Sequence, residues 1–426
     1  LADKVNSELL LECDFSKDNS LETTINEISN KWQNLDFVIH AVAYSDKNEL
    51  NGKYIDTSKE NYPNVRFAVG GRNQKKLQSV LDKYSLDCKI FVADGDDSAA
   101  LDKITSATKV VLSTAGPFHR YGSKMVASCV KNGTHYVDIT GENFWVREMI
   151  AKHHEEAKQK GVRIIPACGY DSIPSDLGVF FAAKSFGGPI KSIYSYHTMK
   201  GEASGGTIET MFAIRDLKLD RSAFGAFALN PKNSITETQK KLTSDRVSVQ
   251  KNKTLGVWTG PFVMAMANAR VVRRGAALLA EDNNGYGKDF VYKESAYYSK
   301  KRSAYITTFM LAVMGVVIVT PLRKIVRPLL KQPGHGPSQK VMDGGFFRCK
   351  LLVTGEDGNQ KIYSMGGDGD PGYKVTSKFV CESALSLLGD QRNLPGGPGY
   401  GGILTSSSGL GHVLIDRLKN VGIVFE

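Results

Sequence analysis

Several residue types are missing from the first part of this chain. Residues 1–62 contain no arginine and a single glycine, Gly52, although the 426-residue chain has 42 glycines. The same stretch holds six lysines and twelve acidic residues, a net charge of −6, whereas the whole chain carries +11, which leaves +17 for the remainder. Two different compositions therefore meet near Tyr62, and we expect residues 1–62 to be a fragment joined to a longer unit.

Closely spaced cysteine pairs are absent as well. The six cysteines are scattered without a CxxC spacing, which is typical of reduced intracellular thiols and argues against a disulfide framework or a metal site. His153 and His154 have no third ligand nearby and are expected on a solvated helix face. Arginine–aromatic repeats and zinc-finger spacings are also missing, so no nucleic acid is expected as a partner. The positive remainder instead suits an anionic cofactor, an acyl thioester or a membrane surface.

Short apolar runs alternate with amphipathic segments from residue 63 onward. The runs occupy residues 65–69, 89–94, 109–114, 134–139 and 162–167, and helical spacing fills the segments between them. This alternation predicts an α/β fold with a parallel, doubly wound sheet. We expect a Rossmann dinucleotide-binding domain over 63–186, a second α/β domain for substrate or dimerisation over 187–390, and a C-terminal segment over 391–426.

The end of the second expected strand lacks an acid. The chain reads Gly70, Gly71, Arg72, Asn73 there. In folds that bind a cofactor without a 2′-phosphate, a carboxylate at this position accepts hydrogen bonds from the ribose hydroxyls. A guanidinium fits a phosphate and stacks on adenine. Gly71, Arg72 and Asn73 therefore favour NADP over NAD, with a surface arginine after a turn as the alternative.

Other strand ends supply further cofactor candidates, because ligands bind at the carboxyl edge of such a sheet. Asp94 follows the third strand, where the adenine would lie. The fourth strand ends toward the nicotinamide ribose in Ser113, Thr114, Ala115, Gly116 and Pro117. Each of these residues has a capping or turn role as its alternative.

Polar residues after the sixth strand are the weak catalytic candidates. Tyr170 is a conceivable proton donor, and Asp171 a contact to substrate or nicotinamide; Asp171, Ser172 and Asp176 are otherwise expected as helix caps. Arg273 and Arg274 are candidates for holding a phosphate or carboxylate, with a surface salt bridge as the alternative.

Residues 63–426 resemble the saccharopine dehydrogenase-like oxidoreductases, which include the bacterial trans-acting enoyl reductases. The resemblance is carried by residues 70–73 (GGRN), 114–118 (TAGPF), 136–142 (YVDITGE), 169–178 (GYDSIPSDLG), 271–274 (VVRR) and 415–418 (IDRL). It implies a Rossmann domain, a second α/β domain and a nicotinamide cofactor.

Residues 1–62 are similar to an internal slice of the enoyl-acyl-carrier-protein reductases. The matching words are residues 12–14 (ECD), 36–43 (DFVIHAVA), 46–50 (DKNEL) and 52–57 (GKYIDT). The glycine-rich loop of that family would precede Leu1, and its catalytic tyrosine and lysine would follow residue 62. The resemblance therefore implies a structural remnant, and we do not expect this slice to reduce an enoyl thioester.

The glycine-rich phosphate loop that opens a dinucleotide-binding fold is absent before Val65. Residues 36–43 are apolar, of strand length, and separated from Val65 by enough chain for a crossover helix. We therefore expect this run to fill the slot of the missing first strand. Residues 44–48 make a poor phosphate cradle, so cofactor affinity is expected to be weak.

One apolar run stands out in the second expected domain. Residues 303–322 contain no charged residue, and the run only just reaches the roughly 20 residues that a membrane-spanning helix needs. We expect an anchor in one membrane leaflet or in a lipid-droplet monolayer, with a buried helix or a homodimer interface as the alternative. Basic residues flank it on both sides and give no orientation: Lys300, Lys301, Arg302, Arg323, Lys324 and Arg327.

The sequence thus predicts an NADP-dependent oxidoreductase, with NAD as the alternative cofactor, that acts on a lipid or acyl substrate such as an enoyl thioester. Its expected location is intracellular and membrane-associated, at a lipid droplet, a mitochondrion or the cytoplasmic face of a membrane. The alternative is a non-catalytic protein of the same membranes with a degenerate cofactor site.

Overall fold

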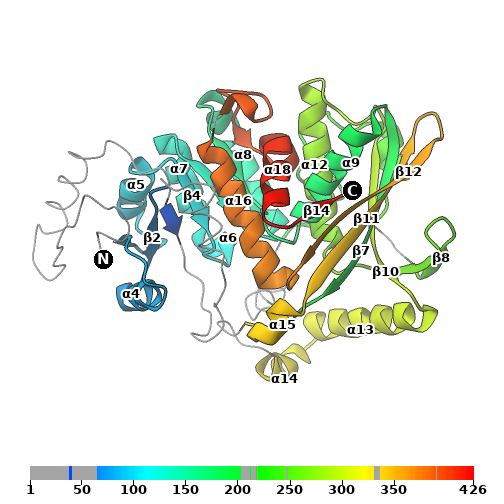
Figure 1. Ribbon diagram of the computed structural model, residues 1–426, viewed down its shortest axis with the longest axis horizontal. Coiled ribbons are helices and arrows are strands. Elements are labelled where there is room, and N and C mark those ends of the chain that lie inside the picture. The colour runs from blue at the N-terminus through cyan, green and yellow to red at the C-terminus, as the bar shows by residue number, and fades with distance from the viewer. Residues whose placement is uncertain are drawn as a thin grey trace, which may run out of the picture.

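Two seven-stranded sheets make up the structure. The computed structural model describes the backbone of residues 38–40, together with residues 65–202, 212, 217, 219–245, 248–330, 336–389 and 391–426. Most of residues 1–62 lie outside this part. Figure 1 shows the parallel sheet on one side of the molecule, the second sheet on the other, and helices α16 and α18 between them.

The first sheet is parallel throughout, in the order β13-β6-β5-β4-β1-β2-β3. Strands one to six follow the order of a dinucleotide-binding fold, which confirms the expected Rossmann-like class. The strands are shorter than the apolar runs that predict them. Their bounds are β1 Val38–His40, β2 Ala68–Gly71, β3 Lys89–Val92, β4 Val110–Ser113, β5 His135–Asp138, β6 Arg163–Ile165 and β13 Gly402–Ile403.

The slot of the first strand is filled from the amino-terminal fragment. In β1, Ile39 pairs with Val69 of β2 on one side and with Leu112 of β4 on the other, both in parallel. The prediction is confirmed for Val38–His40, the part of the run that the structure describes. A central parallel strand supplies ladder partners to both neighbours, so its loss would leave backbone groups of β2 and β4 unpaired.

The second sheet is mixed, in the order β14-β12-β11-β7-β10-β9-β8, and only β7 and β10 run parallel. Strands β11 and β12 form an antiparallel hairpin in this sheet. The segment after residue 390 supplies β13 to the first sheet and β14 to the second. The bounds are β7 Ile190–Lys200, β8 Gln250–Asn252, β9 Val257–Gly260, β10 Val291–Tyr298, β11 Phe346–Gly355, β12 Gln360–Asp368 and β14 Val424–Phe425.

Helices cover the parallel sheet and fill the space between the two sheets. The longer ones are α4 Gln74–Lys83, α5 Ser98–Ser106, α7 Ser123–Asn132, α8 Asn143–Gln159, α9 Ile173–Phe186, α12 Ala265–Glu281, α13 Lys301–Val319, α16 Thr376–Leu388 and α18 Gly411–Asn420. The shorter ones are α6 Phe118–Tyr121, α11 Glu237–Leu242, α14 Arg323–Val326, α15 Gln339–Asp343 and α17 Ser406–Gly409, with the turns η1 Arg221–Phe224, η2 Arg327–Leu329, η3 Pro371–Val375 and η4 Gln391–Asn393.

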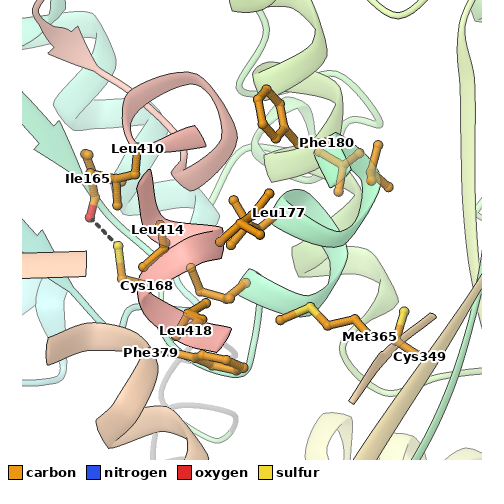
Figure 2. Packing of buried hydrophobic residues seen from close by; sticks show 14 of the residues in the cluster. Ile165, Cys168, Leu177, Phe180, Cys349, Met365, Phe379, Leu410, Leu414 and Leu418 are labelled. Carbon is orange, nitrogen blue, oxygen red and sulfur yellow. Dashed lines mark hydrogen bonds between the residues drawn. The ribbon is translucent and has the colours of Figure 1, made fainter. Parts of the chain in front are cut away.

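One hydrophobic core joins the two sheets. It contains Leu112 of the parallel sheet, Leu351 of the second sheet and Leu177 of α9, each at most 2% exposed. Figure 2 shows Leu177 of α9 on the side of that helix toward Leu414 of α18. Because the core is continuous across both sheets, the carboxyl edge of the parallel sheet is held in a fixed position relative to the second sheet.

Candidate functional site

The carboxyl end of β2 places Arg72 beside a tyrosine from another loop. The Arg72 guanidinium carbon lies 5.5 Å from the centre of the Tyr121 ring, a cation–π contact. Arg72 is exposed, and within the described residues no carboxylate is paired with it. Asn73 caps α4 by accepting a hydrogen bond from the Lys76 backbone at 3.0 Å. The guanidinium is therefore positioned at the strand end, and no carboxylate of the described residues neutralises its charge there.

The turn after β3 gives Asp94 a local role. One Asp94 carboxylate oxygen accepts a hydrogen bond from the Asp96 backbone at 3.0 Å, while the residue remains exposed. Gly71, at the end of β2, accepts from the backbone of Ala93 at 3.1 Å. The ends of β2 and β3 are thus joined directly, with Asp94 in the turn that follows. Its contact with adenine stays a prediction.

The turn after β4 is held by a buried glutamate that the sequence analysis did not single out. Glu142 is 2% exposed and accepts from the backbone amides of Phe118 and His119 at 3.0 and 2.9 Å. Its carboxylate also lies 2.7 Å from the His119 ring nitrogen Nδ1. These bonds fix the start of α6 and therefore the preceding residues 113–117. No local pattern announces this contact, because 24 residues separate Glu142 from Phe118.

Within this turn the candidate residues differ in how accessible they are. Ser113 is 1% exposed, and its hydroxyl accepts from the Ala115 backbone at 3.4 Å. Ala115 is 4% exposed, whereas Gly116 is exposed, and Thr114 and Pro117 are partly exposed. The structure thus gathers Ser113, Thr114, Ala115, Gly116 and Pro117 in one turn at the carboxyl edge, which is the placement expected for a cofactor cleft.

Asp138 ties the ends of β5 and β6 together. Its carboxylate accepts from the backbone amides of Thr140 and Ala167, both at 2.9 Å, and from the Tyr136 hydroxyl at 3.0 Å. Burial raises the Asp138 pKa to about 7, although these hydrogen bonds oppose the rise. The carboxyl group organises the loop after β6, where Tyr170 and Asp171 lie.

Tyr170 and Asp171 differ in environment although they are neighbours. The Tyr170 ring packs in the core against Phe347 at 5.5 Å, its backbone donates to Thr376, and burial raises its pKa well above the ordinary value. Asp171 is only partly buried, and its carboxylate has no hydrogen-bond partner in the described part of the chain. A β-carbon added to Gly141 would lie 3.8 Å from that carboxylate, so Asp171 reaches the turn after β5.

Burial raises the Asp171 pKa to about 6. A carboxyl group that is partly protonated near neutral pH can donate a proton to a bound substrate. On geometry and proton affinity together, Asp171 is a better candidate than Tyr170 for this role, although both assignments stay predictions.

Several polar residues of the sequence analysis have structural roles instead. Asp176 is no helix cap: it is 1% exposed and accepts from the Ser406 hydroxyl and the Ser407 backbone and hydroxyl at 2.7–2.8 Å. His154 is not solvated, because its ring nitrogen Nδ1 accepts from the Ile403 backbone at 3.0 Å. Ser172 precedes α9 without a side-chain capping bond.

The predictions for Arg273 and Arg274, as phosphate- or carboxylate-binding residues or as members of surface salt bridges, are wrong. The two side chains are buried, at 5% and 1% exposed. Arg273 pairs with Asp245 at 3.0 Å and donates to the Ala226 carbonyl at 2.8 Å. Arg274 donates to the carbonyls of Leu229 and Ile403. Side-chain spacing on α12 could not reveal these acceptors, because they come from distant loops. In the described residues no group of three or more His, Cys, Asp or Glu side chains could hold a metal ion.

Comparison with known proteins agrees with this architecture. The family model of the saccharopine dehydrogenase NADP binding domain matches residues 55–165, and that of enoyl-(acyl carrier protein) reductase matches residues 1–66. The two matches overlap around the change in composition near Tyr62.

Whole-length relatives are trans-acting enoyl reductases of mycobacteria. The protein from Mycobacterium ulcerans (strain Agy99) is 32% identical over 396 residues, covering 85% of this chain and 91% of the relative. The protein from Mycobacterium bovis (strain BCG / Pasteur 1173P2) is 30% identical over 401 residues, covering 84% and 90%. Apo saccharopine dehydrogenase (L-Glu forming) from Saccharomyces cerevisiae shares the fold, with a TM-score of 0.52 at 12% identity over 92% of this chain and 100% of that one.

Proposed function

Since the chain belongs to the saccharopine dehydrogenase-like oxidoreductase family that includes the trans-acting enoyl reductases, we propose that it reduces an acyl or lipid substrate, of the enoyl type, with NADPH. The observation that carries the proposal is the meeting of three groups at one sheet edge: the Arg72 guanidinium, the turn of residues 113–117 and the carboxyl group of Asp171.

The residues at this edge fit an NADP cofactor. Arg72 presents a guanidinium, unpaired with any carboxylate of the described residues, where the adenosine ribose of a bound dinucleotide lies in this fold, and the sequence has no acid directly after β2, where NAD would need one. The cation–π contact with the Tyr121 ring helps to hold the guanidinium at this edge. Residues 113–117, fixed by Glu142, would contact the nicotinamide half. NAD remains the alternative, bound without the phosphate contact.

A bound NADPH supplies a hydride to one carbon of a conjugated double bond. The other carbon then needs a proton. We expect the Asp171 carboxyl to give it and to be reprotonated from solvent, because this side chain is partly exposed. The turn of residues 113–117 positions the reacting groups, and the buried Glu142 keeps that turn rigid.

The first test is cofactor selection. Arg72→Ala should raise KM for NADPH by about 10- to 100-fold and leave KM for NADH unchanged, because only the phosphate contact is lost. Oxidation of NADPH and, separately, of NADH with an enoyl thioester measures the two values. Lys75→Ala, at an exposed cation in the first turn of α4, is the matched control. Equal effects of Arg72→Ala on the two cofactors would refute the phosphate contact.

The second test is the pH dependence of turnover. Asp171 must be protonated to act as an acid, so kcat/KM should fall as pH rises through about 6, the value to which burial raises its pKa. Asp171→Asn should lower the rate about 100-fold or more and remove this limb of the profile. If kcat/KM of Asp171→Asn still fell as pH rises through about 6, another group would be the proton donor.

The alternative function is a non-catalytic protein of a membrane or lipid droplet. Two observations favour it: the sequence lacks a glycine-rich phosphate loop before Val65, and α13 exposes apolar side chains. In that case NADPH binding would be too weak to detect and no substrate would be reduced, while the protein would still float with lipid. Fractionation of cells into droplets, mitochondria and other membranes would locate it.

A further inference from the structure

Helix α13 exposes its large apolar side chains, whereas a helix on the surface of a soluble protein normally buries them. Phe309 and Met310 are 70% and 64% exposed, whereas Ala304 is fully buried. On the buried side, the Thr308 hydroxyl lies 3.2 Å from where a β-carbon on Gly260 of β9 would be. A threonine thus faces the protein while large apolar side chains face outward. In the described part of the chain, α13 is the one helix long and apolar enough to cross a membrane.

The exposed apolar surface is a broad arc and not a narrow seam. Its members are at least 37% exposed and span the helix and the segment after it: Tyr305, Ile306, Phe309, Met310, Val313, Met314, Val316, Val319, Leu322, Ile325 and Leu329. Two paired helices bury a stripe of each, whereas a lipid surface can cover a wide arc. Exposed apolar area of this extent indicates a partner outside the chain.

The charges around α13 favour an anionic lipid surface over a second copy of the chain. Between Glu294 and Asp343 the sequence contains no acidic residue, and basic residues flank both ends of the helix, with Lys300, Arg302 and Lys324 exposed. Pairing α13 with a second α13 would bring like charges together in either orientation. Anionic headgroups would instead attract both ends and leave the apolar arc in the acyl region.

The ligand-binding edge of the parallel sheet faces the same side of the molecule. In Figure 1, α4 and α6 lie below β2 and β4, the strands that precede them, and α13, α14 and α15 lie on this lower side too. Hydrogen bonds connect the loop after β6 with α15 on this side. The Tyr170 backbone donates to the Thr376 hydroxyl, which donates to the Pro371 carbonyl of η3, and the adjacent Asp370 amide donates to the Met342 carbonyl of α15.

We propose that α13 seats the protein in the plane of an anionic phospholipid leaflet, so that the carboxyl edge with Asp171 takes its acyl substrate from that lipid surface and not from water. The substrate class is then a membrane-resident lipid with an unsaturated acyl chain. The substrate part of this inference depends on the proposed reductase function, whereas the seating of α13 does not.

Vesicle binding by the full chain tests the seating. The purified protein should float with phosphatidylcholine vesicles that contain about 30% phosphatidylserine, and less with phosphatidylcholine alone, by about fivefold for each basic residue engaged. The double variant Phe309→Glu/Met310→Glu should bind at least tenfold more weakly, since both side chains leave the lipid. Ile362→Glu, a residue 49% exposed on β12, is the control and should bind like the wild type.

Two results would overturn the seating. One is wild-type binding that the double variant retains. The other is a wild-type dimer in light scattering that the double variant converts to a monomer, with no vesicle binding by either. The second result would assign α13 to a contact between copies of the chain.

Substrate presentation tests the second part. With a long-chain enoyl lipid in the same vesicles, the double variant should lose at least about tenfold in rate, in step with its binding. With a short-chain, water-soluble enoyl thioester its rate should match the wild type. If the double variant matched the wild type in rate on both substrates, uptake of the substrate from the lipid surface would be refuted. Inactivity of the wild type on both substrates, with vesicle binding intact, would refute the reductase function and leave the seating of α13 supported.

Discussion

Helices α12 and α13 have opposite relations to their surroundings. On α12, the charged side chains of Arg270, Arg273 and Arg274 are at most 5% exposed, whereas on α13 the apolar side chains of Phe309 and Met310 are at least 64% exposed. A soluble helix normally buries its apolar face and exposes its charged one. Both helices depart from that pattern, and they do so for different reasons.

The difference shows how burial depends on partners and not on residue type alone. Each α12 arginine has acceptors inside the protein: Asp245 pairs with Arg270 and Arg273, and backbone carbonyls accept from Arg274. Buried charge is tolerated where such partners exist. The apolar arc of α13 has no comparable cover in the described residues. The buried charges of α12 therefore have partners within the chain, whereas the described residues supply none for the apolar side chains of α13.

The largest expected effect on stability comes from replacing a buried arginine of α12. Arg274→Met should lower the free energy of unfolding by about 2–4 kcal/mol, because the carbonyls of Leu229 and Ile403 lose their donors inside the core. Urea titration measures the loss. Arg302→Met, an exposed arginine on α13, is the control, expected within about 0.5 kcal/mol of the wild type. If the two variants lost similar free energies of unfolding, the buried arginine of α12 would matter no more than an exposed one on α13.

A smaller effect is expected at Asp245, which is partly exposed. Asp245→Asn leaves Arg270 and Arg273 without their carboxylate and should cost about 1–2 kcal/mol near neutral pH, less than a fully buried pair because solvent reaches the site. Urea titration at neutral pH gives this value. A variant as stable as the wild type would show that the backbone carbonyls suffice for the two guanidiniums.

Acid should act on the same pair. Burial alone would raise the Asp245 pKa, but the guanidiniums of Arg273 and Arg270 outweigh it and hold the pKa below the ordinary value. The stability from a depressed carboxyl pKa is present above about pH 4 and is lost as pH falls through the folded-state pKa. The wild type should therefore lose stability below about pH 4 more steeply than Asp245→Asn, in unfolding curves across this range.

The smallest effect is expected on the α13 side. Phe309→Glu should change the free energy of unfolding in lipid-free buffer by no more than about 0.5 kcal/mol, because the side chain is already in water. Thermal unfolding with and without anionic vesicles checks this, and only the wild type should be stabilised by them. A large loss in buffer alone would mean that Phe309 packs within the protein.

Local patterns predicted much of the fold. The alternation of apolar runs and helical segments gave the parallel sheet, and the run at residues 36–43 gave the strand that replaces the missing first one. The strand-end residues from Ser113 to Pro117 were also predicted at one edge. In each case the signal is a short periodicity or the rule that ligands meet the carboxyl ends of parallel strands, and both can be read from consecutive residues.

Contacts between distant segments could not be predicted. Glu142 reaches the amides of Phe118 and His119, and His154 reaches the Ile403 backbone across 249 residues. No periodic pattern in the sequence marks these acceptors. From the sequence, the role of Glu142 was therefore missed, and His154 was wrongly placed on a solvated helix face. Asp176 likewise finds its donors on α17, far along the chain.

The sequence by itself determined the family words, the α/β alternation and an apolar segment of near-membrane length, because these depend on residues that are close together in the chain. Only the tertiary structure decided which charges are buried and which apolar side chains are not. The physical reason is that a buried charge needs hydrogen-bond partners from other segments, and those partners are brought together only when the two sheets pack around α9, α12 and α18.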